Sequence, residues 1–108
     1  MATINDFKKI EIRVGEIISA EAVVDSTKLA RLEVDFKEES KRQIVAGIAP
    51  FFPDLSLIIG KKFAFITNLE PRTIRGLESQ GMILAAADKD NLSLLSIDQS
   101  IEPGTLIS

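Results

Sequence analysis

The sequence contains neither cysteine nor histidine among its 108 residues. Without cysteine there is no disulfide framework and no thiolate zinc site. Without histidine the chain lacks the most common metal ligand and the most common general acid or base. Carboxylates and lysines remain, but no close pair of them stands out from ordinary strand surfaces. We therefore expect a protein that is not an enzyme and that has neither a metal site nor a cofactor.

Long apolar runs are also missing. No segment approaches the roughly 20 apolar residues that a membrane-spanning helix requires. The N-terminal segment MATINDFKK carries Asp6 and has no apolar core, which is unlike a secretory signal peptide. We therefore expect a cytoplasmic protein without a membrane partner. The chain is 45% hydrophobic and 27% charged, a globular composition, and its length fits a single domain spanning residues 1–108.

Positive charge is scarce overall. The net charge of −3 argues against a nucleic-acid-binding protein, because such proteins usually carry an excess of lysine and arginine. The charges are unevenly distributed, however. Residues 61–76 hold four basic side chains against one acidic side chain, a net of +3, whereas residues 77–108 hold one against five, a net of −4. A basic face on an acidic body is therefore compatible with this sequence.

Alternating apolar and polar residues indicate β-strands along most of the chain. In one such segment Leu32 and Val34 are expected to point inward, and Arg31 and Glu33 outward. In the first strand Gly15 interrupts the alternation, and Ile17 and Ile18 break its period as a bulge or sharp bend would. A first strand that kinks at a glycine is what a small barrel requires where it turns a corner. The expected strands cover residues 8–24, 29–36, 42–48, 61–69 and 80–87, and two shorter strands lie within residues 91–97 and 104–108.

Residues 49–60 have a different pattern. Pro53 and Asp54 are residues that start helices and Gly60 is one that ends them, so we expect one or two helical turns there. Three strands, a short helix and two strands is the order of the OB-fold, a five-stranded Greek-key barrel. An open all-β sandwich is the alternative. The helix between the third and fourth strands favours the OB barrel.

The barrel is expected to cover about residues 6–88, which leaves residues 89–108 as a C-terminal β extension. The extension is rich in leucine and isoleucine, and these side chains require burial against other apolar surface. It either caps the open end of the barrel or pairs with a second copy of the chain. We favour a homodimer with two-fold symmetry that uses this extension.

Several motifs carry a resemblance to a known family. They include RQIVAGIA at Arg42–Ala49 and NLEPRTIRGLESQGMILAA at Asn68–Ala86. Together with DFKKIEIRVGEIISAE at Asp6–Glu21 and LLSIDQSIEPGT at Leu94–Thr105, they resemble the tRNA-binding domain appended to methionyl-tRNA synthetases and the stand-alone dimeric tRNA-binding proteins. The resemblance spans nearly the whole chain, and the combination of N-L-x-P, R-G-x-x-S-x-G-M and L-A-A is specific.

The resemblance implies an OB-fold dimer that binds tRNA by shape and backbone, without strong sequence discrimination. It also implies the synthetase catalytic domain as a partner, in cis or in trans, during aminoacylation. A sister branch, similar to secretion-associated chaperone-like dimers, carries S-S-A-Q-I-T where this sequence has Val45–Ala49. A peptide- or protein-binding dimer of the same fold is the alternative function. Met1 fits either a free-standing protein or an excised synthetase domain.

Arg72 and Arg75 are expected on the loop between the fourth and fifth strands, which borders the nucleic-acid groove of OB-folds. Guanidinium groups present forked donors to phosphate oxygens. Arg75 immediately precedes Gly76 within the family motif, so the resemblance implies an RNA contact there. Incidental charge on a solvated loop is the alternative for both arginines.

Three more motif residues, Asn68, Ser79 and Met82, are candidate RNA contacts. The Asn68 amide suits a base edge or a ribose hydroxyl, and it equally suits the backbone of the turn before Pro71. The Ser79 hydroxyl suits a phosphate. Met82 suits either a flat base or the apolar core.

Further cations are expected around the groove. Arg13, Lys28 and Arg42 come from the first strand, the following turn and the third strand, and ordinary surface charge is their alternative. Lys61 and Lys62 are expected to supply positive field rather than contacts. The candidate RNA-binding residues are therefore Arg13, Lys28, Arg42, Asn68, Arg72, Arg75, Ser79 and Met82.

The aromatic residues limit the mode of binding. There is no tryptophan or tyrosine, and Phe36, Phe63 and Phe65 are spaced like core residues. Phe51 and Phe52 are adjacent, and their expected use is to pack the short helix. Without clear stacking surfaces, recognition of folded RNA by shape and backbone fits better than single-strand binding.

Overall fold

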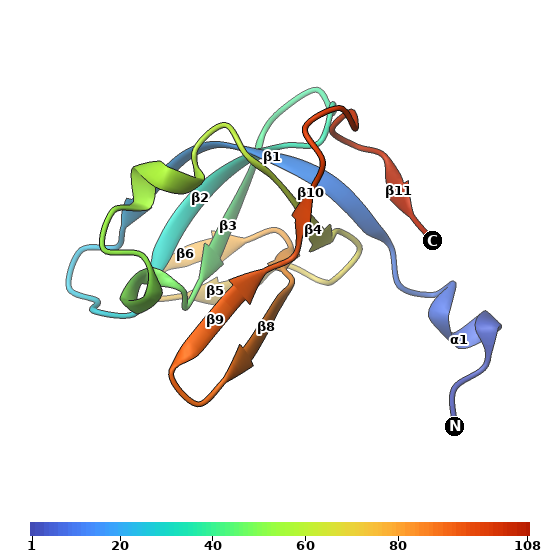
Figure 1. Ribbon diagram of the computed structural model, residues 1–108, viewed down its shortest axis with the longest axis horizontal. Helices are drawn as coiled ribbons and strands as arrows, with labels where there is room; N and C mark the ends of the chain where they lie inside the picture. The colour runs from blue at the N-terminus through green and yellow to red at the C-terminus, as the bar shows by residue number, and fades with distance from the viewer.

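The computed structural model describes residues 1–108 and consists mainly of β-strands, which confirms the predicted all-β class (Figure 1). One α-helix, α1 (Ile4–Phe7), precedes the strands, and two 3-10 helices, η1 (Ala49–Phe51) and η2 (Leu55–Ile58), interrupt them. The strands are β1 (Ile12–Ala22), β2 (Ala30–Asp35), β3 (Arg42–Ala46), β4 (Lys62–Ile66), β5 (Arg72–Ile74), β6 (Leu77–Ser79), β7 (Met82–Ile83), β8 (Ala85–Asp88), β9 (Asn91–Leu94), β10 (Ser96–Ile97) and β11 (Leu106–Ile107).

β1 organises the main sheet because it pairs with two neighbours in succession. Its first part, up to Glu16, pairs with β4, and its remainder pairs with β2. β3 follows on the far side of β2. The order of the main path is β10–β4–β1–β2–β3, with β7 also on β4 and β11 also on β1. In Figure 1 the long ribbon of β1 sweeps across the molecule and links the two ends of this curved sheet.

The irregularity predicted where Ile17 and Ile18 break the alternation is present. The register between β1 and β2 shifts between Ile17 and Ser19, whereas the pairing of β1 with β4 continues through Gly15. A Cβ atom at Gly15 would lie 2.6 Å from a methyl carbon of Val34 and 2.7 Å from the ring of Phe36. Glycine is required here because core side chains already occupy the space that any side chain would need.

The core lies on the inner face of this sheet, as the alternating pattern predicts. Leu32 and Val34 are fully buried on β2, while Arg31 and Glu33 are exposed on its other face. All three phenylalanines that were expected in the core are buried. The rings of Phe36 and Phe65 pack edge to face with their centroids 5.3 Å apart, a favourable aromatic geometry.

The fifth strand is not the continuous segment 80–87 that the sequence predicts. Residues 82–84 lie along β4, after which the chain leaves it to form the β8–β9 hairpin. The chain returns at Leu95, whose carbonyl oxygen accepts from the Ala64 amide at 3.0 Å, and β10 continues along β4. One face of the inserted hairpin covers the core, because Leu94 is buried and Leu92 packs beside it.

The expected helical turns between the third and fourth strands are present as η1 and η2. Asp54 caps η2 by accepting from the Ser56 amide at 3.0 Å, and hydrogen bonds from Ser56 lower the pKa of this carboxyl. Gly60, with φ of +81°, follows the helix. None of the helices has the length and hydropathy needed to cross a lipid bilayer.

Two strands of the C-terminal region pair with strands of the same chain: β10 pairs with β4, and β11 pairs with β1. Lys62 helps to hold this region. It is only 9% exposed, and its Nζ atom donates to the carbonyl oxygens of Gln99 and Ile101 at 2.7 Å each. The Lys62 ammonium group is therefore held by backbone acceptors of the C-terminal region, where it keeps its positive charge.

Candidate nucleic-acid interface

Residues 72–79, predicted as a loop, form the β5–β6 hairpin. Ile74 pairs with Leu77, so Arg75 and Gly76 make a two-residue turn. Their φ angles are +52° and +78°, and a type I′ hairpin turn requires positive values at both positions. Asn, Asp or Gly usually occupies the first position, because a left-handed conformation costs other residues about 1 kcal/mol. Arg75 therefore adopts a backbone conformation that is unfavourable for arginine.

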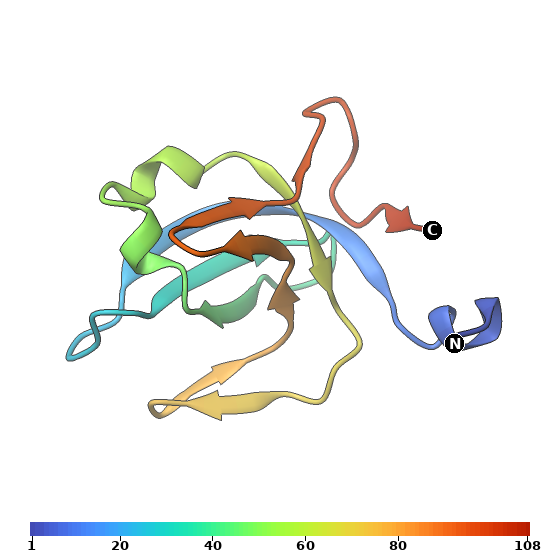
Figure 2. The ribbon, with the colours of Figure 1, turned by 60° about the horizontal axis from the view of Figure 1, so that its bottom comes forward.

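Arg75 lies beside the loop that joins β1 to β2. Its Nη1 atom is 3.5 Å from the Asp25 carbonyl oxygen, and no carboxylate pairs with it. A hollow of about 310 Å³ between the hairpin and the end of β1 is lined by apolar residues, among them Val23 and Leu77, and by the charged residues Glu21, Arg31 and Arg75. The hairpin tip and the β1–β2 loop lie on the same side of the molecule in Figures 1 and 2. The guanidinium of Arg75 is thus exposed and free to take an anionic ligand.

Two more cations remain unpaired near this side. Lys28 lies in the β1–β2 loop, and Arg72 lies at the base of the β5–β6 hairpin; both are exposed and neither forms an ion pair. Arg72 lines a small hollow of about 70 Å³ together with Met82. Met82 is 45% exposed, so the core is not its place. We call Lys28, Arg72 and Arg75 the basic rim.

Arg42 is arranged in the opposite way. Its Nε and Nη2 atoms each donate to Glu38 at 2.8 Å, and its Nη1 atom donates to the carbonyl oxygens of Thr67 at 2.6 Å and Gln80 at 3.1 Å. The guanidinium also lies over the Phe36 ring, 5.3 Å from its centroid. Its hydrogen bonds lower the pKa of Glu38, and Glu38 in turn raises the pKa of Arg42. Every nitrogen of this guanidinium is engaged within the chain.

Ser79 and Gln80 join the same arrangement from the other side. Ser79 is 5% exposed. Its hydroxyl accepts a hydrogen bond from the Val45 amide at 3.0 Å and donates one to the Gly81 carbonyl oxygen at 3.1 Å. The Gln80 side chain accepts from the Gln43 amide at 2.9 Å, while the Gln80 amide donates to the Gln43 carbonyl oxygen at 2.8 Å. Side chains thus tie β3 to the segment after β6. We call Arg42, Gln43, Val45, Ser79 and Gln80 the Arg42 seam.

Asn68 and Arg13 are also committed to the fold. The Asn68 amide accepts from the Glu11 amide and donates to the Lys9 carbonyl oxygen, both at 2.8 Å, rather than bonding its own turn. Arg13 pairs with Glu11 at 2.9 Å and lies 3.5 Å from the Gly104 carbonyl oxygen. Hydrogen bonds from Thr67 and then Arg13 lower the pKa of Glu11.

The predicted set therefore divides into two groups. Exposed side chains on or near the β5–β6 hairpin and the β1–β2 loop form the first group: Lys28, Arg72, Arg75 and Met82. Side chains that form hydrogen bonds inside the chain make up the second: Arg13, Arg42, Asn68 and Ser79. The sequence reasoning overlooked Lys41. This unpaired cation lines a polar hollow of about 230 Å³ on the outer face of β1, β2 and β3. The charged stretch KEESK was its only signal, and that stretch looks like an ordinary loop.

Comparison with known proteins identifies the family of this chain. The chain matches, over residues 12–106, the family described as "Putative tRNA binding domain". It is 46% identical over 106 residues to the methionine–tRNA ligase of Caldanaerobacter subterraneus subsp. tengcongensis, which covers 98% of this chain and 16% of that protein. The chain therefore spans 16% of the length of this curated relative.

Solved structures agree as well. The MetRS related protein from Pyrococcus horikoshii superposes with a TM-score of 0.92 at 34% identity, covering 100% of this chain and 98% of that one. The CsaA chaperone protein from Picrophilus torridus superposes with a TM-score of 0.89 at 31% identity, covering all of both chains. Since the family match takes in nearly every strand of the fold, the chain belongs to this family of tRNA-binding domains.

Proposed function

We propose that this chain binds tRNA by shape and backbone contacts and has no catalytic role of its own. It acts in the cytoplasm as an appended or stand-alone module that assists methionyl-tRNA synthetase-type aminoacylation. The observation that carries the proposal is the exposed, unpaired guanidinium of Arg75 at the tip of the β5–β6 hairpin. A residue held in an unfavourable backbone conformation, with its charge left free, is typical of a functional position.

The proposed RNA contacts are the basic rim and Met82. Guanidinium and ammonium groups there bind phosphates, and Met82 offers an apolar surface to a sugar or a base. In this proposal three predicted residues do not contact RNA themselves: Arg42, Ser79 and Asn68. They fix the framework from which the hairpin projects, because their polar atoms are already bonded within the chain.

We further propose a single domain, residues 1–108, in which the Arg42 seam closes the curved sheet into an OB-type barrel. The barrel covers about residues 6–88 and the C-terminal extension about residues 89–108. In an OB barrel the third and fifth strands meet where the sheet closes. The bonds from Ser79 and Gln80 to β3 support that assignment, because they stand in for the missing part of the strand ladder.

The module is proposed to be a homodimer. Exposed apolar side chains gather where α1 meets the C-terminal strand β11, around a hollow of about 280 Å³ lined by Ile4, Phe7, Ile10 and Leu106. α1 is a four-residue helix with no buried residue. So short a helix is not stable alone in water, and cover from a second copy of the chain supplies the missing burial.

A salt titration with bulk tRNA in a filter-binding assay tests the proposal. The logarithm of the affinity should fall linearly with the logarithm of the salt concentration, because each Lys or Arg that reaches a phosphate releases a counterion. The variant Arg75→Asn separates binding from folding, since Asn is favoured in this turn. We expect it to fold at least as well as the unaltered protein and to bind all tRNAs about tenfold more weakly.

Lys37→Asn is a matched control. Lys37 also has a positive φ, +61°, but its ammonium pairs with Glu102 at 3.8 Å. Its replacement should leave tRNA affinity unchanged. An affinity that ignores salt, or an Arg75→Asn protein that binds like the unaltered one, would contradict the proposal.

A chaperone-like dimer that binds peptides or proteins is the second candidate. Its support is the superposition on the CsaA chaperone protein and the exposed apolar surface beside α1. Competition between labelled tRNA and an unfolded polypeptide distinguishes the two functions. Binding of the polypeptide alone, equally strong in Arg75→Asn, favours the chaperone.

A further inference from the structure

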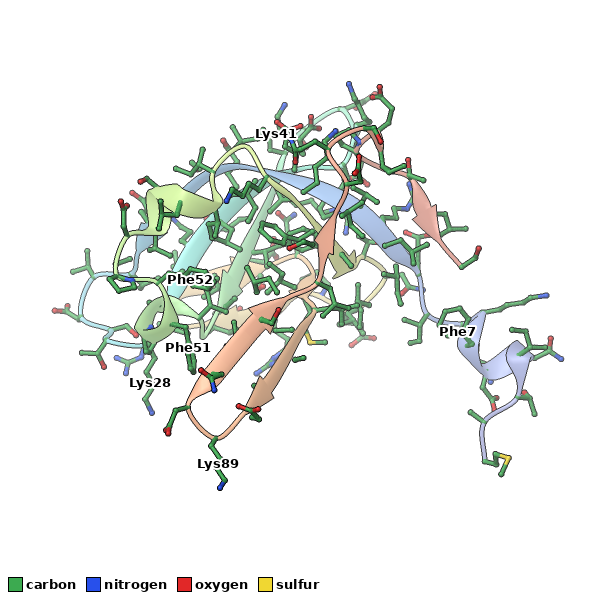
Figure 3. The ribbon with its side chains drawn as sticks, viewed as in Figure 1. Phe7, Lys28, Lys41, Phe51, Phe52 and Lys89 are labelled. Carbon is green, nitrogen blue, oxygen red and sulfur yellow. The ribbon has the colours of Figure 1, made fainter.

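Phe51 is an aromatic side chain that the fold leaves at the surface. It lies on η1 and is 39% exposed, whereas its neighbour Phe52 packs against the core. The other exposed phenylalanine, Phe7, lies on α1 at the far end of the molecule (Figure 3). The expected use of Phe51, packing of the short helix, is therefore only partly met, and part of this aromatic residue is exposed to a ligand.

Hydrogen bonds connect the helix of Phe51 to the basic rim. The Ala49 amide, at the start of η1, donates to the Lys28 carbonyl oxygen at 3.2 Å. Arg75 reaches the same β1–β2 loop at the Asp25 carbonyl oxygen. The loop thus contacts η1 on one side and the β5–β6 hairpin on the other. Lys28 therefore belongs to the loop that Arg75 reaches, and a hydrogen bond joins its backbone to the helix that carries Phe51.

The charge beside Phe51 favours an anionic ligand. Lys28 forms no ion pair, and Figure 3 shows its side chain extending outward at the same end of the molecule as Phe51. Lys89 projects from the β8–β9 hairpin at this end too, but Asp88 and Asp90 flank it and offset its charge. A ligand whose aromatic group lies on Phe51 would therefore bind its anionic group to Lys28.

We infer that Phe51 stacks an unpaired RNA base whose phosphates lie on Lys28 and Arg75. An aromatic ring next to a cationic track is the arrangement that proteins use to hold single-stranded nucleotides. An unpaired nucleotide carries both parts, a flat base and a phosphate, within one residue. The inference deepens the proposed function: the folded RNA is held by its backbone at the rim, and a base from a loop or a single-stranded end is held on η1.

The absence of tryptophan and tyrosine makes this inference directly measurable. In Phe51→Trp the new indole is the only tryptophan, and a base stacked on it should quench its fluorescence. Titration with bulk tRNA and with a single-stranded oligoadenylate should quench the emission, and a blunt RNA duplex of the same length should not. Phe7→Trp, with its indole at the opposite end, should respond to none of the three.

Affinity supplies the second readout. Phe51→Leu keeps an apolar side chain on η1 but removes the aromatic face, and tRNA binding should weaken about tenfold, the low end of the loss for one stacked base. Phe51→Tyr should restore it. Unchanged affinity in Phe51→Leu, or quenching of Phe51→Trp by an unfolded polypeptide but not by RNA, overturns the inference while leaving the Arg75 test intact. If Arg75→Asn and Phe51→Leu both bind tRNA as tightly as the unaltered protein, the proposed function is overturned as well.

Discussion

The basic rim and the Arg42 seam contain the same kind of side chain in opposite states. Arg42 uses all of its guanidinium nitrogens within the chain and is half-buried, whereas Arg72 and Arg75 are exposed and lack carboxylate partners. The contrast shows that a motif arginine has to be judged by its acceptors: where backbone carbonyls and a carboxylate saturate it, its charge holds the fold together.

The two regions also differ in backbone strain. The seam residues lie in or beside regular strands, while Arg75 sits in the left-handed region at a hairpin turn. Local preference would place Asn there and would gain stability by doing so. The rim thus gives up local stability to present a charge, and the seam supplies the rigid support. Variants that separate stability from RNA binding test this division of roles.

The largest effect is expected from Arg42→Ala. The change removes charge-assisted hydrogen bonds to Glu38 and strips a donor from the carbonyl oxygens of Thr67 and Gln80. The free energy of unfolding should fall by about 2 kcal/mol, and the melting temperature by roughly 10 °C. Arg72→Ala is the control and should change the unfolding free energy by less than about 0.5 kcal/mol. Equal effects of the two changes in thermal unfolding would break the comparison.

Ser79→Ala should have the next largest effect. The buried Val45 amide loses its acceptor when the hydroxyl is removed, and an unsatisfied buried amide costs about 1–2 kcal/mol. Thr73→Ala, on the exposed strand that faces β6 in the hairpin, is the matched control and should be close to neutral. If urea unfolding finds Ser79→Ala neutral while tRNA binding is lost, Ser79 belongs to the rim after all.

A smaller, pH-dependent effect should come from Glu38. Hydrogen bonds from Arg42 lower the pKa of Glu38 below its ordinary value of 4.5 in the folded protein. Its stabilising contribution is therefore complete above pH 4.5 and is lost as the pH falls through the lowered pKa. The melting temperature of Glu38→Gln should lie below that of the unaltered protein at neutral pH, and the two should converge in acid. Parallel pH profiles would show that the ion pair adds nothing to the seam.

The strand pattern was predictable wherever one face of a strand meets the core. Leu32 and Val34 are buried and Arg31 is exposed because a half-buried strand has a period of two, and that period is visible in the sequence. The close approach of Val34 and Phe36 to Gly15 was not predictable, because these side chains come from a distant part of the sequence. Local pattern carries no information on such long-range packing.

The local net charge of the candidate site was predictable from the sequence, but the hydrogen-bond partners of its cationic side chains were not. Residues 61–76 carry a net charge of +3, but the Lys62 ammonium group among them is nearly buried and donates to carbonyl oxygens of the C-terminal region. Arg42 likewise meets Thr67, a residue 25 positions away. Hydrogen bonds of this kind decide which cations face an RNA, and they arise from topology rather than from local sequence.

The smallest effect is expected from Arg72→Ala on binding. Arg72 stands at the base of the hairpin beside Met82, away from the turn and the β1–β2 loop that place Arg75 and Lys28. One phosphate contact should be lost, so the slope of log affinity against log salt should become shallower by about 1. Affinity at moderate salt should fall only a fewfold and equally for different tRNAs, because the contact carries no sequence information. A loss confined to particular tRNAs would instead show that Arg72 contacts bases. The basic rim would then contribute sequence-specific recognition as well as electrostatic attraction.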